Sequence, residues 1–182
     1  MIRSSYKNTI DYSDIFSSIC FMKKPQKIIE IGILDGYSLQ SIVNNVDSSC
    51  SINAYDIFEE FNGNSANKEK LDNIFSKYEN VSIEYGDFYK LHESIDENSL
   101  DILHIDIANN GNIYQFTFDN YMKKLKKDGL LIIEGGSNER DNIEWMHKYN
   151  FPKINPIINN YKILYNIHTI GTIPSITLIS HI

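Results

Sequence analysis

The sequence is poor in the residues that build several common kinds of site. Its 182 residues include only two cysteines, Cys20 and Cys50, and no C-x-x-C pair. Two isolated thiols argue against a disulfide framework and a zinc site, and they suit a reducing cytoplasm. No apolar run approaches the length of a membrane span, and the polar start of the chain carries no visible signal peptide. We therefore expect a cytoplasmic protein with no membrane partner.

Positive charge is also scarce. The chain has 17 Lys and Arg residues against 24 Asp and Glu, a formal net charge of −7. This balance argues against a nucleic acid as the main partner. Hydrophobic residues at 42% and charged residues at 23% are ordinary for a globular protein. The length predicts a single domain over residues 1–182, with residues 1–25 as an N-terminal helical cap.

A third absence concerns glycine. The segment KIIEIGILDGYS, residues 27–38, is an apolar run that ends at Gly32, followed by Gly36 and an amphipathic helix. A parallel α/β sheet presents the N-terminus of its first helix to a ligand in this way. The G-x-G-x-x-G of dinucleotide-binding proteins is missing, because Leu34 and Tyr37 stand where two of its glycines would be. This opposes an NAD-binding oxidoreductase.

Apolar periodicity predicts alternating helices and strands along the whole chain. Five strand–helix units followed by two strand-like runs predict an α/β fold, a doubly wound and mostly parallel sheet closed by a C-terminal antiparallel hairpin. The predicted strands cover residues 27–31, 51–58, 81–88 with the exit turn, 100–106, 129–134, 161–171 and 174–182. The predicted helices cover residues 11–22, 39–46, 71–78, 114–125 and, capped by Asn138 and Asp141, 143–147.

Acids stand at the ends of successive strands, where an open α/β sheet binds its ligands. Asp56 follows Gly36 by twenty residues, the distance at which an acid meets a ribose diol. Each of these residues alone has an ordinary explanation, such as a helix cap or a loop acid. Their order along the strands is what favours a ligand site. The strand-end residues are Asp56, then Asp87 with Phe88, then Asp106, then Glu134.

Glu30 precedes Gly32 by two residues, so the first turn reads acid-x-Gly-x-x-x-Gly. This pattern resembles motif I of the class I methyltransferases that depend on S-adenosylmethionine (SAM), and the resemblance extends over about residues 27–135. It implies a Rossmann-like fold, SAM as cofactor and an adenine contact through Asp87 and Phe88. The cofactor-binding residues would then be Glu30, Gly32, Gly36, Asp56, Asp87 and Phe88.

The stretch from Asp101 to Gly136 resembles the small bacterial methyltransferases that act on sugars and natural products. In that group, acids after the fourth and fifth strands often bind metal, which implies Mg²⁺ between Asp106 and Glu134. Two convergent oxygen ligands suit such a hard cation. The chain departs from the pattern, with Ala108-Asn109 in place of a usual histidine and Gly135 in place of a second acid. Alternatively, Asp106 faces the SAM ammonium group and Glu134 caps a turn.

His104 shares a strand face with Asp106, so both are candidate catalytic residues. His104 alternatively is a hydrogen-bonded core histidine, and Arg140 either binds an acidic substrate or pairs with Asp141 or Glu144. The expected function is methyl transfer from SAM to a hydroxyl of a small-molecule acceptor, a sugar or secondary metabolite, with a divalent cation as an optional aid. The alternative is a non-catalytic nucleotide-binding or scaffold protein. The oligomeric state is not indicated.

Overall fold

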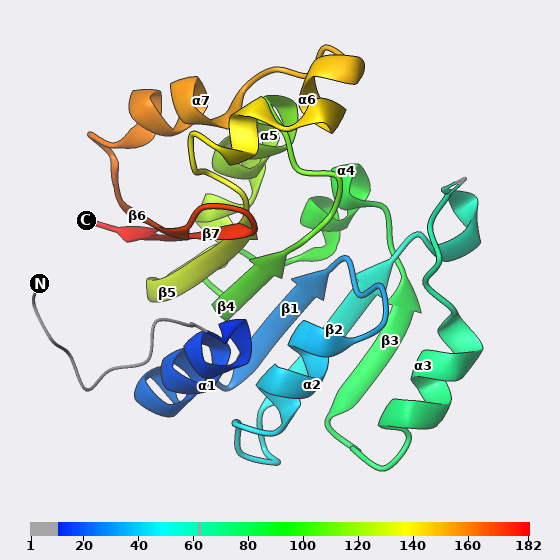
Figure 1. The fold of residues 1–182 in the computed structure, drawn as a ribbon. Helices are drawn as coiled ribbons and strands as arrows, with labels where there is room; N and C mark the ends of the chain where they lie inside the picture. The colour runs from blue at the N-terminus through cyan, green and yellow to red at the C-terminus, as the bar shows by residue number, and fades with distance from the viewer. Residues whose placement is uncertain (1–10, 62) are drawn as a thin grey trace, which may run out of the picture.

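The computed structural model describes residues 11–61 and 63–182, which form α/β layers around one seven-stranded sheet (Figure 1). The strand order is β3-β2-β1-β4-β5-β7-β6; β1 to β5 pair in parallel, and β7 pairs antiparallel with both β5 and β6. This confirms the predicted Rossmann-like sheet and its antiparallel hairpin. The strands are β1 (Lys27–Ile31), β2 (Ser51–Asp56), β3 (Val81–Tyr85), β4 (Leu100–Ile105), β5 (Leu125–Glu134), β6 (Tyr165–Gly171) and β7 (Ser175–His181).

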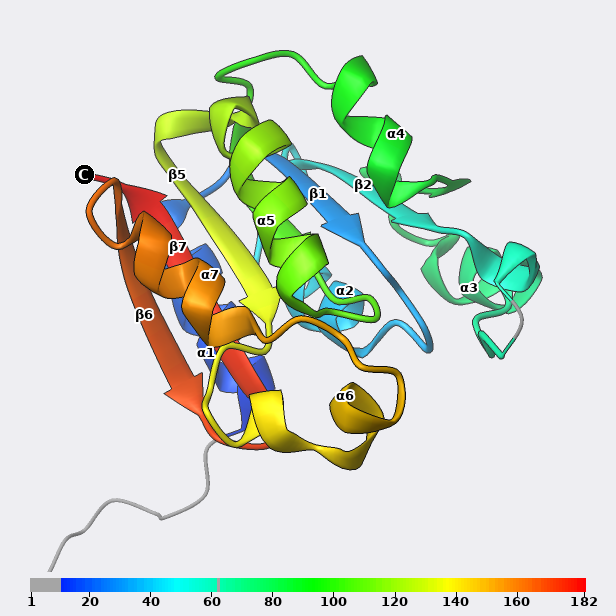
Figure 2. The ribbon, with the colours of Figure 1, turned by 90° about the horizontal axis from the view of Figure 1, so that it is seen from above.

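Helices cover both faces of the sheet. Helices α1, α2 and α3 lie on one face, and α4, α5 and α7 lie on the other (Figure 2). Residues 1–10 of the expected N-terminal cap lie outside the described residues, and α1 forms its described part. The helices are α1 (Tyr12–Lys23), α2 (Tyr37–Val43), α3 (Lys68–Phe75), α4 (Phe88–Leu91), α5 (Gly111–Asn120), α6 (Glu144–Lys148) and α7 (Ile154–Tyr161), with 3-10 turns η1 (Phe58–Glu60), η2 (His92–Ser94), η3 (Met122–Lys124) and η4 (Arg140–Asn142).

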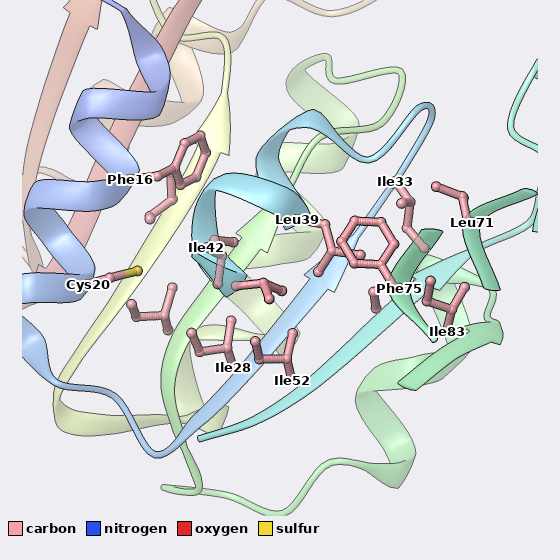
Figure 3. Close-up of a cluster of buried hydrophobic side chains, with 14 of the residues drawn as sticks. Phe16, Cys20, Ile28, Ile33, Leu39, Ile42, Ile52, Leu71, Phe75 and Ile83 are labelled. Atoms are coloured by element: carbon pink, nitrogen blue, oxygen red, sulfur yellow. The ribbon is translucent and has the colours of Figure 1, made fainter. Parts of the chain in front are cut away.

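The sheet is buried on both faces, which explains why its central strands read as continuous apolar runs. Successive residues of β1 point into opposite layers: Ile28 joins the cluster under α1, α2 and α3, whereas Ile29 joins the cluster under α4, α5 and α7. In Figure 3, Phe16 and Cys20 of α1 lie close to the sheet residues of the first cluster. Helix α1 is therefore fixed against this face of the sheet by apolar packing.

Helix α7 is the main element that differs from the sequence expectation, which assigned no helix between residues 147 and 161. Asp141 accepts hydrogen bonds from the backbone N–H groups of Ile154 at 2.7 Å and Asn155 at 2.8 Å, so it caps α7 and not the helix at 143–147. Pro156 lies in the first turn of α7, where the missing N–H has no intrahelical acceptor. The spacing of Ile154, Ile158 and Tyr161 was the signal available for this helix.

Candidate active site

The turn after β1 is formed around Gly32, which adopts a φ of +91°. A Cβ atom at this position would lie 2.0 Å from the carbonyl oxygen of Asp106, and the Asp106 N–H donates to Ile31 at 2.9 Å. The sequence suggested that this glycine makes room for a ligand. The structure adds a more immediate reason: the backbone at the end of β4 occupies the space that a side chain would need.

Gly36 stands at the start of α2 and faces α3. It is the N-cap residue of α2 with a φ of +82°, and a Cβ there would lie 2.9 Å from Phe75 and 3.1 Å from Leu71. Gly36 lines neither of the two cavities described below. This glycine therefore allows α3 to pack closely against the start of α2, and its contact with the cofactor stays a prediction.

Two cavities meet at the carboxyl ends of the parallel strands. The larger, of about 540 Å³, lies over the ends of β1 to β4, and the smaller, of about 280 Å³, lies between the first turn, α1 and the ends of β4, β5 and β7. Gly32, Leu34 and Asp106 line both cavities. This is the edge of the sheet where a ligand was predicted, and the sizes are typical of small-molecule sites.

Asp87 and Phe88 lie where the sequence placed them, in the wall of the larger cavity. Asp87 also caps α4, accepting a hydrogen bond from the Tyr89 N–H at 2.9 Å. The ring of Phe88 stacks on Tyr121 with a centroid distance of 5.2 Å. The structure thus gives Asp87 the capping role and leaves it beside the space for a ligand.

Asp56 also lines the larger cavity, but its carboxylate is already well supplied with donors. One oxygen accepts from the N–H groups of Ile33 at 2.8 Å and Leu34 at 3.3 Å, and the other accepts from the Phe58 N–H at 2.9 Å and the Asn64 side chain at 2.7 Å. Asp56 therefore holds the glycine turn against the segment after β2. A ribose diol would have to replace one of these donors, and the Asn64 amide is the one side chain among them.

Glu30 is fully buried and lines neither cavity, and its contact with the cofactor stays a prediction. Its Oε1 lies 2.9 Å from Nδ1 of His104 and accepts a hydrogen bond from the Ser38 hydroxyl. Ser38 and His104 do line the smaller cavity, and the His104 ring meets Phe16 edge-on. Glu30 thus holds two side chains of the cavity wall in place.

Asp106 stands at the junction of the two cavities and is open to both. Among the described residues, no cationic side chain forms an ion pair with its carboxylate. Loss of water around this carboxyl group raises its pKa, and the nearby Glu30 adds to the effect, whereas His104 and Arg140 oppose it. A carboxylate without a fixed partner in a ligand cavity is available to a substrate.

Glu134, in contrast, is paired. Its two carboxylate oxygens accept from Nε of Arg140 at 2.7 Å and from Nη2 at 3.1 Å. Of the two alternatives for Arg140, pairing with Asp141 or Glu144 is wrong: its partner is Glu134, and Asp141 is engaged in capping α7. The alternative contact with an acidic substrate stays a prediction. Burial raises the pKa of Glu134, although the adjacent guanidinium opposes the shift.

The residues predicted to hold Mg²⁺ do not form a suitable site. Both oxygens of Glu134 are bound by Arg140, whose positive charge also faces Asp106. Within residues 11–61 and 63–182, no three His, Cys, Asp or Glu side chains are grouped as metal ligands. The Oδ1 atom of Asn109 is buried without a partner, but Asn109 lines neither cavity.

Several residues of the smaller cavity come from segments that the sequence did not connect with the site. Tyr12 and Phe16 of α1 line it, and the Tyr12 hydroxyl donates to the Pro174 carbonyl at 2.5 Å. Tyr37, at the start of α2, also lines this cavity and donates to Asp11 at 2.6 Å. Helical spacing predicted α1, but only the tertiary structure brings α1 against the hairpin.

Comparison with known proteins agrees with this geometry. The model of a family described as a methyltransferase domain matches residues 29–134, from β1 to the end of β5. The chain belongs to this methyltransferase domain family. The predicted resemblance to class I SAM-dependent methyltransferases is thereby confirmed. A search of curated proteins gave no match.

Solved structures share the fold at low sequence identity. A putative O-methyltransferase from Klebsiella pneumoniae is 14% identical, with a TM-score of 0.70 over 98% of this chain and 83% of its own. The O-methyltransferase TomG from Streptomyces achromogenes, solved with SAM, is 13% identical, with a TM-score of 0.71 over 95% and 81%. A putative caffeoyl-CoA O-methyltransferase from Staphylococcus aureus is 16% identical, with a TM-score of 0.65 over 95% and 85%. None of the described helices is long and apolar enough to cross a membrane.

Proposed function

We propose that this methyltransferase transfers the methyl group of SAM to a hydroxyl of a small molecule. The observation that carries the proposal is the position of Asp106, whose carboxylate has no ion-pair partner among the described residues and lies where the two cavities meet. Family membership supports the reaction type. The fold shared with TomG, which was solved with SAM, and with a fungal methyltransferase solved with S-adenosylhomocysteine (SAH) supports the cofactor.

In this proposal, each cavity serves one part of the reaction. Asp87 and Phe88 of the larger cavity bind the adenosine part of SAM, which supplies an electrophilic sulfonium methyl group. The acceptor enters the smaller cavity, where Asp106 or His104 takes the proton of its hydroxyl. Because methyl transfer is a displacement along one line, the main task of the surrounding residues is orientation. Glu30 and Ser38 contribute by fixing the His104 side of the cavity.

The walls of the smaller cavity favour one class of acceptor. They are mostly apolar, so they match a flat apolar body that carries a hydroxyl better than they match a sugar. This supports an aromatic secondary metabolite, and TomG is described as taking part in tomaymycin synthesis. The apolar and aromatic lining residues are Tyr12, Phe16, Ile33, Leu34, Tyr37, Pro174 and Ile176.

The proposal is tested by binding and then by turnover. Calorimetry with SAM, SAH, NAD and ADP should show binding of the first two, and a thermal shift should follow because a ligand of the native state stabilises it. Asp87→Leu should weaken SAH binding, whereas Asp96→Leu, at an exposed loop position, should not. Methyl transfer from labelled SAM to a panel of phenols and sugars then separates an enzyme from a scaffold. Binding of SAH without transfer to any acceptor would favour the scaffold alternative.

A further inference from the structure

The Arg140–Glu134 pair occupies a defined place in the fold. Asp106 follows β4 and Glu134 ends the adjacent parallel strand β5, and Ile105 of β4 pairs with Ile133 of β5. These two acids are the ones that a divalent cation would need at this edge of the sheet. The planar guanidinium of Arg140 instead binds both oxygens of Glu134 in a bidentate geometry.

Arg140 is held by groups from several segments, so its position is well defined. The residue is 8% exposed, and its Nη2 also donates to the Asn109 carbonyl at 3.2 Å. Its backbone N–H donates to the Ser137 hydroxyl at 2.9 Å, and its guanidinium carbon lies 5.2 Å from the Trp145 ring centroid. Moving the guanidinium aside would leave Glu134 largely buried and unpaired, which is strongly unfavourable.

The charges of the site also oppose a divalent cation. Arg140 forms an ion pair with Glu134, so the charge of this carboxylate is already balanced. A cation beside Asp106 would therefore have one free carboxylate ligand and a fixed positive charge as its neighbour. The Nη1 atom of Arg140 is buried without a partner among the described residues, and a donor of this kind binds oxygen and not metal.

We propose that Arg140 takes the place of a divalent cation in this methyltransferase, so that transfer proceeds without metal and the acceptor needs only one hydroxyl. A metal-assisted site selects acceptors with two adjacent oxygens, because both oxygens then chelate the cation. An arginine already bound to Glu134 makes no such demand. That the acceptor needs only one hydroxyl rests on the proposed function. That Arg140 takes the place of a cation does not.

The absence of a cation site is tested by titrating Mn²⁺ into the full chain. The electron paramagnetic resonance signal of the free ion shows how much Mn²⁺ stays unbound. The parent protein should show no saturable Mn²⁺ binding. Arg140→Gln, which frees both oxygens of Glu134, should gain a site that is lost again when Asp106→Asn is added. Lys126→Gln, which breaks the separate Lys126–Asp101 pair, is the matched control and should gain nothing.

Tight Mn²⁺ binding to the parent protein would overturn the proposal, whatever the variants do. A folded Arg140→Gln protein with no gain of Mn²⁺ binding would overturn the idea that Arg140 stands in the cation's place. If Arg140→Gln does not fold, Arg140→Lys is used, which keeps the positive charge but not the bidentate guanidinium. This variant, like the parent, should bind no Mn²⁺. Saturable Mn²⁺ binding by it would also overturn the proposal.

The acceptor statement is tested with phenol and catechol as probes, each with and without EDTA. We expect both to be methylated, with rates unchanged by the chelator. Methylation of catechol but not of phenol, with the activity abolished by EDTA, would overturn the proposal. If neither probe nor any other acceptor is methylated while SAH binds, the proposed function fails, and the Mn²⁺ titration still decides the role of Arg140.

Discussion

Nδ1 of His104 lies 2.9 Å from Oε1 of Glu30, and these two side chains come from positions that are directly paired between β1 and β4. Both residues are nearly inaccessible to solvent, at 4% and 0% exposure. A hydrogen bond fixes which ring nitrogen of a histidine points away from its partner. Because His104 lines the smaller cavity, this pair determines which ring nitrogen of His104 faces a ligand there.

Replacing Glu30 tests this relationship. In Glu30→Gln the side chain keeps its size but loses its charge, so the bonds from His104 and Ser38 weaken. We expect the fold to persist with a free energy of unfolding lower by about 1.5–3 kcal/mol, the range for hydrogen bonds to charged groups. Turnover should fall more than SAM affinity does, as measured by kinetics and calorimetry side by side.

Glu59→Gln provides a comparison at an exposed site, where the carboxylate accepts a hydrogen bond from the Tyr85 hydroxyl. This variant should change unfolding and turnover little, because exposed pairs contribute little. If Glu30→Gln loses SAM affinity while its turnover at saturating SAM is unchanged, the pair serves the cofactor and not the acceptor.

The first turn gives a second prediction. Gly32→Ala combines a strained left-handed backbone with a contact of 2.0 Å to the Asp106 carbonyl, so β4 must move. We expect a loss of roughly 3 kcal/mol or more, from a left-handed penalty of about 1–2 kcal/mol plus the overlap. Thermal unfolding monitored by circular dichroism measures this loss.

Gly63→Ala separates the two causes. Gly63 has a φ of +101°, but a Cβ there meets no atom within 4 Å. This variant should show the backbone penalty alone, about 1–2 kcal/mol. Equal losses for the two variants would mean that the contact with β4 is unimportant.

Sequence reasoning was most successful where local pattern and global fold agree. The buried parallel strands read as apolar runs, and β1 was predicted with the bounds that the structure shows, 27–31. Helix α7 was missed because Pro152 and Pro156 interrupt the sequence, although Pro156 fits the first turn. Strand β5 is longer than predicted because it begins at Leu125 and passes through an irregularity of the pairing opposite Leu100 and Ile102.

The position of the site was predicted from the sequence, but the side chains that pair with its residues were not. The sequence indicates that Asp106 and Glu134 end adjacent strands, but not that Arg140 folds back onto Glu134. The cavity position of Tyr12 likewise depends on contacts across the whole chain, 162 residues apart for the Tyr12–Pro174 hydrogen bond. Pairings of this kind depend on tertiary packing, which the spacing of residues along one segment does not contain.

Asp56 supports a third prediction. Asp56→Ala should weaken SAM affinity by about 1.5–3 kcal/mol, the range for hydrogen bonds to a charged group, and should also lower stability because four donors lose their acceptor. Asn64→Ala removes the side-chain donor to Asp56, together with the acceptor of the Ala66 N–H, and should leave SAM affinity equal or higher. A 2′-deoxyribose analogue of SAH distinguishes the causes: unchanged affinity of the parent protein for it would leave Asp56 with a role in the turn alone.

Asp106 gives the last prediction, which joins activity to pH. Desolvation raises the pKa of Asp106 above its ordinary value of 3.8, so the folded protein holds this proton more tightly than the unfolded chain does. The stability that the protonated side chain contributes is fully present below the pKa of the unfolded chain. It is lost as the pH rises through the higher pKa of the folded protein. In Asp106→Asn the side chain is neutral at every pH, and this loss should disappear. Because Asp106 is exposed to solvent in the two cavities, screening weakens this effect. We therefore expect the variant to melt at most slightly above the parent at pH 7, and at a similar temperature at pH 3. Its turnover should fall by about 10²–10⁴-fold, the usual contribution of a general base. Asp96→Asn, at an exposed loop position, should show neither effect. An Asp106→Asn protein that turns over normally, or that is less stable than the parent at pH 7, would contradict both the role and the electrostatics assigned to this residue.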